Sequence, residues 1–358
     1  RSEAVYGCSM NANVKGNVEL TITSGEYGKV FGGNNKSGAI FGHIIVNIEE
    51  TGCTPIIIDE LYGCGNDAAF SVYGYYQDGT IEGTDKPKYV PRKSLTDQTA
   101  VTFEGKPHTD PGENGYDDPE VNIISCTRIG KVFGGGYGAG ATVYGNPKVN
   151  INQMLGIKSD GNGGYITATE LGRIGVDKNG SSDDCGVFGG GNQAKVFGNT
   201  TINIGTETEV DLHASYDKTT GNYTYIENQT VLGALLLLIF FGGGNEANVT
   251  GDTHVNICGT QIVDQTKENG YTDTSVSHSE TTGFAVSIGN SVYGGGNKAD
   301  VEGNTFVTMA DGYVFNGIFG GGYSGSVGTF TSCDKTVTIW NHNPSHEGTC
   351  IGKPTACK

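Results

Sequence analysis

Two adjacent carboxylates, Asp183 and Asp184, stand just before a glycine-rich stretch of the chain. A pair of carboxyl groups can act as acid and base across a glycosidic bond, so these residues are candidates for glycoside hydrolysis. They also end the polar segment 177–181, where solvated carboxylates are ordinary. A solvated loop is the preferred interpretation, and we expect no enzymatic activity.

Histidine and cysteine side chains gather in the C-terminal segment 341–358. His342 and His346, with cysteines nearby, offer the nitrogen and sulfur ligands that zinc takes in proteins. A proline between the two histidines breaks any helix, and their spacing matches no standard zinc site. The competing interpretation is a polar tail in which Cys350 and Cys357 form a disulfide, since the short segment between them can close without strain.

Oxygen-rich side chains occur in two loops, 110–118 and 160–163. Such loops can supply the ligands that calcium prefers, but neither fits the twelve-residue calcium-binding loop. Plain acidic loops are favoured, so we expect no cofactor and keep calcium as an open alternative.

Composition excludes several classes of partner. The 358 residues include 60 glycines and carry a formal net charge of −17. An acidic protein is disfavoured as a partner for nucleic acid and for anionic membrane surfaces. The most apolar run, 231–241, is shorter than the roughly twenty residues that cross a bilayer, so it predicts a buried strand and no membrane span. The nine cysteines show no zinc-type or redox-type spacing, and we expect most to be small buried side chains.

A glycine-rich unit recurs from end to end of the chain and must position any of these groups. The unit 187–204 reads VFGGGNQAKVFGNTTINI, and related copies begin at eight places. Self-similarity at a fixed period is typical of repeat architectures. The starts are Val5, Val30, Leu61, Val132, Val187, Phe240, Val292 and Ile318.

Each unit contains segments of three to five residues in which apolar and polar side chains alternate. This is the period of a strand, and no stretch has a convincing helical period. We therefore predict an all-β protein, a parallel β-solenoid of about eight imperfect coils in which inward Val, Ile and Phe form stacks. We expect glycines to supply positive φ angles at the corners. The glycines predicted as structural turn residues are Gly134, Gly189, Gly242, Gly294 and Gly320.

Long insertions interrupt a solenoid domain predicted for residues 1–340, and 341–358 form the tail. A polar insertion covers about 75–120, and three others cover about 153–183, 205–230 and 259–282. Because the last three each follow the alternating strand, we expect the insertions to emerge from one side of the solenoid.

An asparagine follows the glycines in several copies, at Asn34, Asn192, Asn245 and Asn297. In stacked coils these side chains would form an amide ladder at one corner, as asparagines do in stacked β-structure. The alternative is that asparagine only tolerates the left-handed conformation at this turn.

The repeat resembles those of large glycine-rich surface proteins of gut-type bacteria, which are described as adhesin-like. The resemblance covers most of the chain between Val5 and Ile339 and implies an exported or cell-surface location. The Asp183-Asp184-Cys185 element is similar to one in polygalacturonase-type hydrolases, but the partner motifs of that family are missing downstream.

Two functions from different classes follow. The first is an extracellular structural or adhesive protein of a bacterial surface, with a glycan or host-surface ligand. Repeat sequence begins within five residues of Arg1, so either the chain is part of something longer or its end coils associate head to tail as a filament. The second is a carbohydrate-binding or carbohydrate-active protein that uses its tyrosine-rich insertions.

Overall fold

The structure is a computed structural model in which every regular element of the described residues is a β-strand. It describes residues 1–51, 54–68, 72–73, 75–80, 83, 87–91, 118–151, 157–159, 165–167, 172–181, 185–205, 215–217, 222–224, 234–236, 239–257, 286–309 and 313–328.

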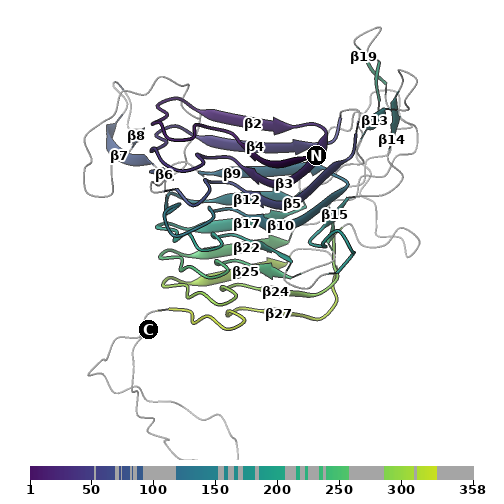
Figure 1. The fold of residues 1–358 in the computed structure, drawn as a ribbon. Helices are drawn as coiled ribbons and strands as arrows, with labels where there is room; N and C mark the ends of the chain where they lie inside the picture. The colour runs from purple at the N-terminus through teal and green to yellow at the C-terminus, as the bar shows by residue number, and fades with distance from the viewer. Residues whose placement is uncertain are drawn as a thin grey trace, which may run out of the picture.

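Two sheets of parallel strands run the length of the stack (Figure 1). The first sheet contains β1 (Ser2–Tyr6), β3 (Gly25–Phe31), β5 (Ile56–Tyr62), β10 (Arg128–Phe133), β15 (Arg173–Ile174), β16 (Gly186–Phe188), β20 (Ala234–Leu236), β21 (Phe240–Phe241), β23 (Val286–Ile288), β24 (Ser291–Tyr293), β26 (Tyr313–Val314) and β27 (Gly317–Phe319). The second sheet contains β2 (Val18–Ile22), β4 (Ile44–Glu49), β9 (Glu120–Ser125), β12 (Lys148–Ile151), β17 (Thr200–Ile204), β22 (Thr253–Ile257) and β25 (Thr305–Met309).

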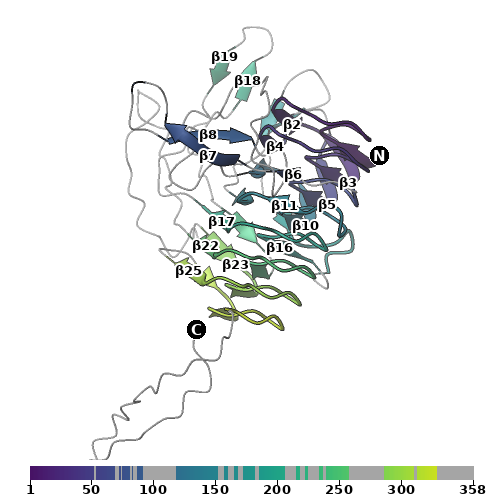
Figure 2. The same ribbon diagram turned by 90° about the vertical axis from the view of Figure 1, so that its left-hand side faces the viewer.

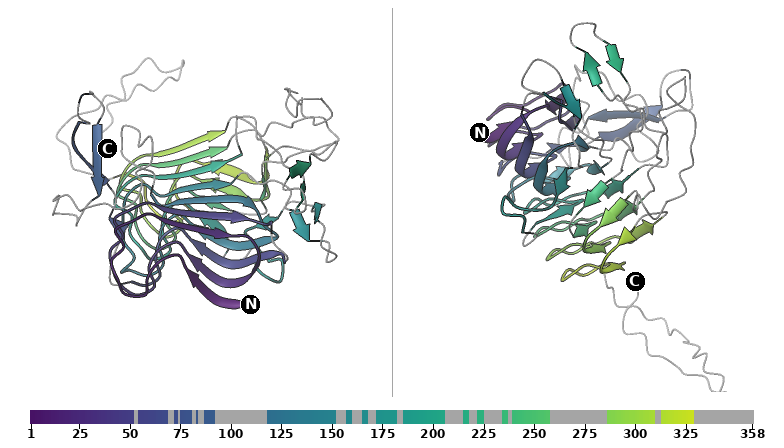
Figure 3. Two further views of the ribbon diagram at one scale, coloured as in Figure 1. Left: turned by 90° about the horizontal axis from the view of Figure 1, so that it is seen from above. Right: turned by 90° about the vertical axis from the view of Figure 1, so that its right-hand side faces the viewer.

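A short third ladder of parallel pairs joins successive coils, and its residues lie along the chain between a strand of the first sheet and a strand of the second. It consists of β6 (Val72–Tyr73) paired with β11 (Val143–Tyr144), followed by single bridges between equivalent valines. The bridges run from Val143 through Val196, Val249 and Val301 to Val327. Seen from above, the coils of the solenoid overlie one another (Figure 3).

Every predicted repeat start occupies the same register column of the first sheet. Val5 pairs with Val30, and the column continues in order through the remaining starts to Ile318. The pairing is parallel throughout, so the prediction of a parallel β-solenoid is confirmed.

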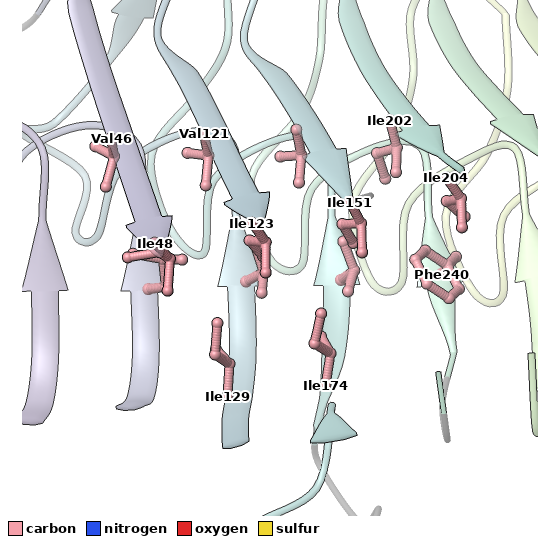
Figure 4. Close-up of a cluster of buried hydrophobic side chains, with 14 of the residues drawn as sticks. Val46, Ile48, Val121, Ile123, Ile129, Ile151, Ile174, Ile202, Ile204 and Phe240 are labelled. Atoms are coloured by element: carbon pink, nitrogen blue, oxygen red, sulfur yellow. The ribbon is translucent and has the colours of Figure 1, made fainter. Parts of the chain in front are cut away.

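Aliphatic side chains fill the space between the two sheets (Figure 4). Alternation along each strand sends every second residue inward, and these residues are buried while their neighbours are half-buried. The core includes Val46, Ile48, Val121, Ile123, Ile129, Ile151, Ile174, Ile202, Ile204 and Phe240.

Eight aromatic rings form a second stack, the aromatic ladder. Adjacent centroids lie 4.7–5.3 Å apart and the planes differ by 4–12°. The prediction of aromatic stacks beside aliphatic ones is confirmed, but these rings form a buried cluster separate from the aliphatic core, because each follows an inward residue. The ladder consists of Tyr6, Phe31, Tyr62, Phe133, Phe188, Phe241, Tyr293 and Phe319.

The first glycine of each Gly-Gly-Gly turn is needed for close approach between coils. Positive φ angles occur at other glycines, such as Gly138 and Gly175, and not at Gly134, Gly189, Gly242, Gly294 or Gly320. A Cβ on any of the first four would collide with the carbonyl oxygen of the equivalent glycine in the next coil. At Gly294 that distance would be 2.5 Å.

The described hairpins of the 153–183 and 205–230 insertions emerge on one side of the stack, as expected, whereas the expectation was wrong for the 75–120 insertion. Hairpins β13 (Ile157–Ser159)–β14 (Tyr165–Thr167) and β18 (Ser215–Asp217)–β19 (Asn222–Thr224) follow strands of the second sheet, and β14 contacts β18. Hairpin β7 (Tyr75–Thr80)–β8 (Pro87–Pro91) instead precedes β9 and lies on the opposite side (Figures 1 and 2). The 75–120 insertion leaves the coil at a different corner.

The leucine run 235–238 belongs in part to the first sheet. Leu236 pairs with Ile174 of one coil and Ile288 of another, so this part of the run occupies a column of aliphatic residues. The prediction of a strand is confirmed for β20.

Alanine substitution tests the close approach of the coils. We expect Gly242→Ala to lower the free energy of unfolding by about 1–3 kcal/mol, because the added methyl group meets backbone that cannot move independently. Gly320→Ala is the matched control, since a Cβ there has no atom within 4 Å. Urea unfolding followed by circular dichroism gives the comparison, and equal midpoints for the two variants would contradict the close-approach role.

Candidate functional site

Most residues predicted for catalysis or metal binding lie outside the described residues. These are Asp183, Asp184, His342, His346, Cys350 and Cys357, with the loops 110–117 and 160–163. Within the described ranges no group of three or more His, Cys, Asp or Glu residues could hold a metal ion. In the same ranges no helix is long and apolar enough to span a membrane.

Asp118, the last residue of the first calcium candidate, has a structural role. Its Oδ2 lies 2.7 Å from Nδ1 of His43, and its Oδ1 accepts the Ile44 N–H at 3.0 Å. The two paired side chains are only 1–2% exposed. A buried carboxylate and imidazole in contact stabilise each other only as a pair. This pair fastens the end of the 75–120 insertion to β4.

Glu50 is a second buried carboxylate with a structural role. Its Oε2 accepts the Ile56 N–H at 2.7 Å and the Thr127 hydroxyl at 2.8 Å. Two hydrogen bonds satisfy a charge that would otherwise be expensive to bury. Glu50 thus closes the corner between the second and first sheets, where no substrate can reach it.

The described cysteines are thiols in nonreactive surroundings. Burial raises the pKa of Cys8 to about 12, and it raises the pKa values of Cys64 and Cys126 above the ordinary range. A nucleophilic or metal-binding cysteine must reach the thiolate form, which these sites oppose. The expectation that cysteines act as small buried side chains holds for Cys64, Cys126 and Cys185, which are buried.

The predicted amide ladder is present on three coils and is named here the turn ladder. Asn245 Nδ2 donates to Asn192 Oδ1 at 2.8 Å, and Asn297 Nδ2 donates to Asn245 Oδ1 at 2.8 Å. Each of these asparagines is half-buried. Tyr137 and Tyr323 occupy the same place in the flanking coils, as their backbone hydrogen bonds indicate.

Asn34 does not belong to this ladder, contrary to the prediction. Its coil has only two glycines before the asparagines, so Asn34 takes the place of the third glycine and Asn35 takes the ladder place. The Asn34 amide is buried and donates to the Gly38 carbonyl at 2.6 Å. Asn66 Nδ2 donates to Asn35 Oδ1 at 2.9 Å, which extends the pattern to an earlier pair of coils.

A second amide ladder, the sheet ladder, lies on the outer face of the second sheet and was not predicted. Each asparagine donates to the one before it at 2.8–3.0 Å. The sequence signal was available, because an asparagine lies between two inward residues in five copies of the alternating strand. The ladder consists of Asn47, Asn122, Asn150, Asn203 and Asn256.

A groove of about 590 Å³ runs along the turn ladder across several coils. Phe188 and Phe241 of the aromatic ladder border it, and the three turn-ladder amides line one wall. Lys131 and the tyrosine that follows the last amide, Tyr323, also line it. Concave surfaces with a few convergent polar groups are the usual location of ligand sites.

Charged residues of the groove lie next to the turn ladder. Gln193 Nε2 donates to Glu246 Oε2 at 3.1 Å, and Lys298 Nζ lies 3.8 Å from Glu246 Oε1. These contacts between equivalent places of successive coils hold the carboxylate of Glu246 at the wall. The arrangement presents amides, aromatic rings, one ion pair and the further cation Lys131, which suits binding better than proton transfer.

No protein family model, no curated protein and no solved structure matches the chain. The resemblance to glycine-rich bacterial surface proteins therefore stays a prediction. The groove and the exposed strand edges are the features from which a function can be proposed.

Alkaline unfolding tests the buried thiols. A thiol whose pKa is raised in the folded state contributes stability below its unfolded pKa of about 8.5, and this stability is lost as the pH rises toward the folded value. For Cys8 the window runs from about pH 9 to about 12. We expect Cys8→Ala to reduce the loss of unfolding free energy by up to about 1.4 kcal/mol per pH unit. Urea unfolding at pH 8, 9, 10 and 11 measures the free energy of unfolding of the wild type and the variant. The same dependence on pH in both proteins would contradict the raised pKa of Cys8.

Proposed function

We propose that this protein is a structural subunit that associates head to tail into a filament on a bacterial surface. The observation that supports the proposal is the aromatic ladder, whose last ring, Phe319, is 48% exposed while an interior ring, Phe188, is 3% exposed. A ring column that continues to an open edge offers a ready surface for one more ring.

Strand β27 is an edge strand whose apolar side chains are exposed. Ile318 is 43% exposed although its equivalents in the interior coils are buried, and Gly320 has no neighbour where a Cβ would point. Among the described strands β27 pairs with β24 alone, so within this part of the chain its other edge is the open end of the sheet. Open edges of this kind pair readily with another strand.

The opposite edge of the same sheet is strand β1, which carries an aliphatic residue and an aromatic residue at the places that match those of β27. Strand β1 pairs with β3 among the described strands, and Val5 and Tyr6 are half-buried. The register would place Ile318 of one copy beside Val5 of the next, and Phe319 against Tyr6. Because the two edges differ, the contact is heterologous and does not close on itself.

An extracellular, adhesive role on the cell surface is part of the proposal. It rests on the resemblance of the repeat and on the net charge of −17, which keeps a large surface solvated. The enzymatic alternative depends on Asp183 and Asp184, which lie outside the described residues. The scaffold function is thus the one with direct geometric support.

Electron microscopy of stained specimens, with light scattering across a concentration series, tests the filament. We expect unbranched fibres of uniform width, and we expect Phe319→Asp to leave only single subunits because it adds a charge to the ring column. Phe315→Asp is the control, since Phe315 is also exposed but outside the ladder. A monodisperse wild-type subunit at high concentration, or equal loss of fibres in both variants, would overturn the proposal.

A further inference from the structure

We propose that the groove beside the turn ladder binds an extended, neutral polysaccharide chain that lies along the solenoid axis. The inference does not depend on filament formation, because the groove is built within one subunit. Nor does it involve the tyrosine-rich insertions.

The turn ladder gives the groove a regular row of hydrogen-bonding groups. Asn192, Asn245 and Asn297 contribute one amide per coil, and coils repeat about every 4.8 Å. An amide has two donor hydrogens and two acceptor lone pairs, and the ladder uses one of each on the central residue. The remaining donor and acceptor are suited to neighbouring hydroxyl groups of a sugar, which also donate and accept.

Tyr323 supplies an aromatic surface at one end of this row. It is 65% exposed and rests edge-on against Tyr293, with ring centroids 5.6 Å apart. An aromatic ring offers a large, rigid and partly apolar contact surface, which matches the C–H face of a pyranose ring. The corresponding residue four coils earlier, Tyr137, packs edge-on against Tyr62 and under the Lys29 ammonium group.

The charges favour a neutral chain over an anionic one. Lys298 and Glu246 lie together within the groove and offset each other, which leaves Lys131 as the one further charged residue of its lining. The whole chain carries a net charge of −17, which repels polyanions at a distance. Hydroxyl-rich polymers without charged groups therefore fit the site best.

A row of similar contacts predicts that affinity depends on ligand length. Each additional sugar ring can reach another coil, and linked contacts add to affinity without further loss of translational freedom. Three turn-ladder coils and Tyr323 span roughly 15 Å. We expect the dissociation constant to fall from disaccharide to tetrasaccharide and then to level off.

Isothermal titration calorimetry with neutral oligosaccharides of two to six units tests the proposal. The probes are glucose, xylose, mannose, galactose and N-acetylglucosamine oligomers with β linkages. At least one series should bind to wild-type protein with the expected length dependence. Tyr323→Ala and Asn245→Ala should each weaken that binding at least tenfold.

Asn203→Ala is the matched control for Asn245→Ala. Asn203 is also central in an amide ladder, donating to Asn150 and accepting from Asn256, but it lies on the second sheet away from the groove. The same loss of binding in Asn203→Ala would contradict the site. Absence of binding in every neutral series, or binding of polygalacturonate alone, would overturn the proposal. Since Tyr323 is exposed, its variant tests the site even if Asn245→Ala fails to fold.

Discussion

The backbone hydrogen bonds of this solenoid run between coils. A strand in a parallel stack finds its hydrogen-bond partners only in the coils on either side, so each coil depends on its neighbours. The stacking distance of about 4.8 Å then governs every other choice of residue. At the Gly-Gly-Gly turn the distance leaves no room for a side chain, so glycine is required at Gly189 and Gly242. Along the strands, the same distance brings identical or similar side chains of successive coils into contact. Planar rings can then stack and amides can hydrogen-bond to one another.

These columns of like residues explain how a chain with few functional motifs can still have specific surfaces. Rings repeat outside the aliphatic core, and amides repeat along both the turn and the second sheet. Each column is held together by contacts between successive coils and ends where the sequence changes, as at Tyr323. A binding surface therefore arises as a row of weak, repeated groups, whereas a catalytic centre would need different groups to converge.

Much of the fold could be predicted, because the glycine-rich repeat and the alternation of apolar and polar residues are both recognisable in the sequence. The turn ladder was predicted for Asn192, Asn245 and Asn297, but Asn34 was misplaced because its turn has one glycine fewer. A Val-Phe pair is too short to show which of its two side chains points into the aliphatic core, so the separate location of the rings could not be predicted. Partners such as His43 and Asp118 are separated by 75 residues, so only the folded structure reveals their contact.

Disulfide cross-linking across two coils tests the in-register stack most directly. Thr201 and His254 are register partners on the outer face of the second sheet, whereas Asn256 lies two residues further along the same strand. Thr201→Cys combined with His254→Cys should form a disulfide on mild oxidation, because register partners in a parallel pair lie within the Cα separation that a disulfide spans. Thr201→Cys combined with Asn256→Cys should not. Mass spectrometry of the digested protein distinguishes the two results, and preferential cross-linking of the second pair would contradict the stacked register.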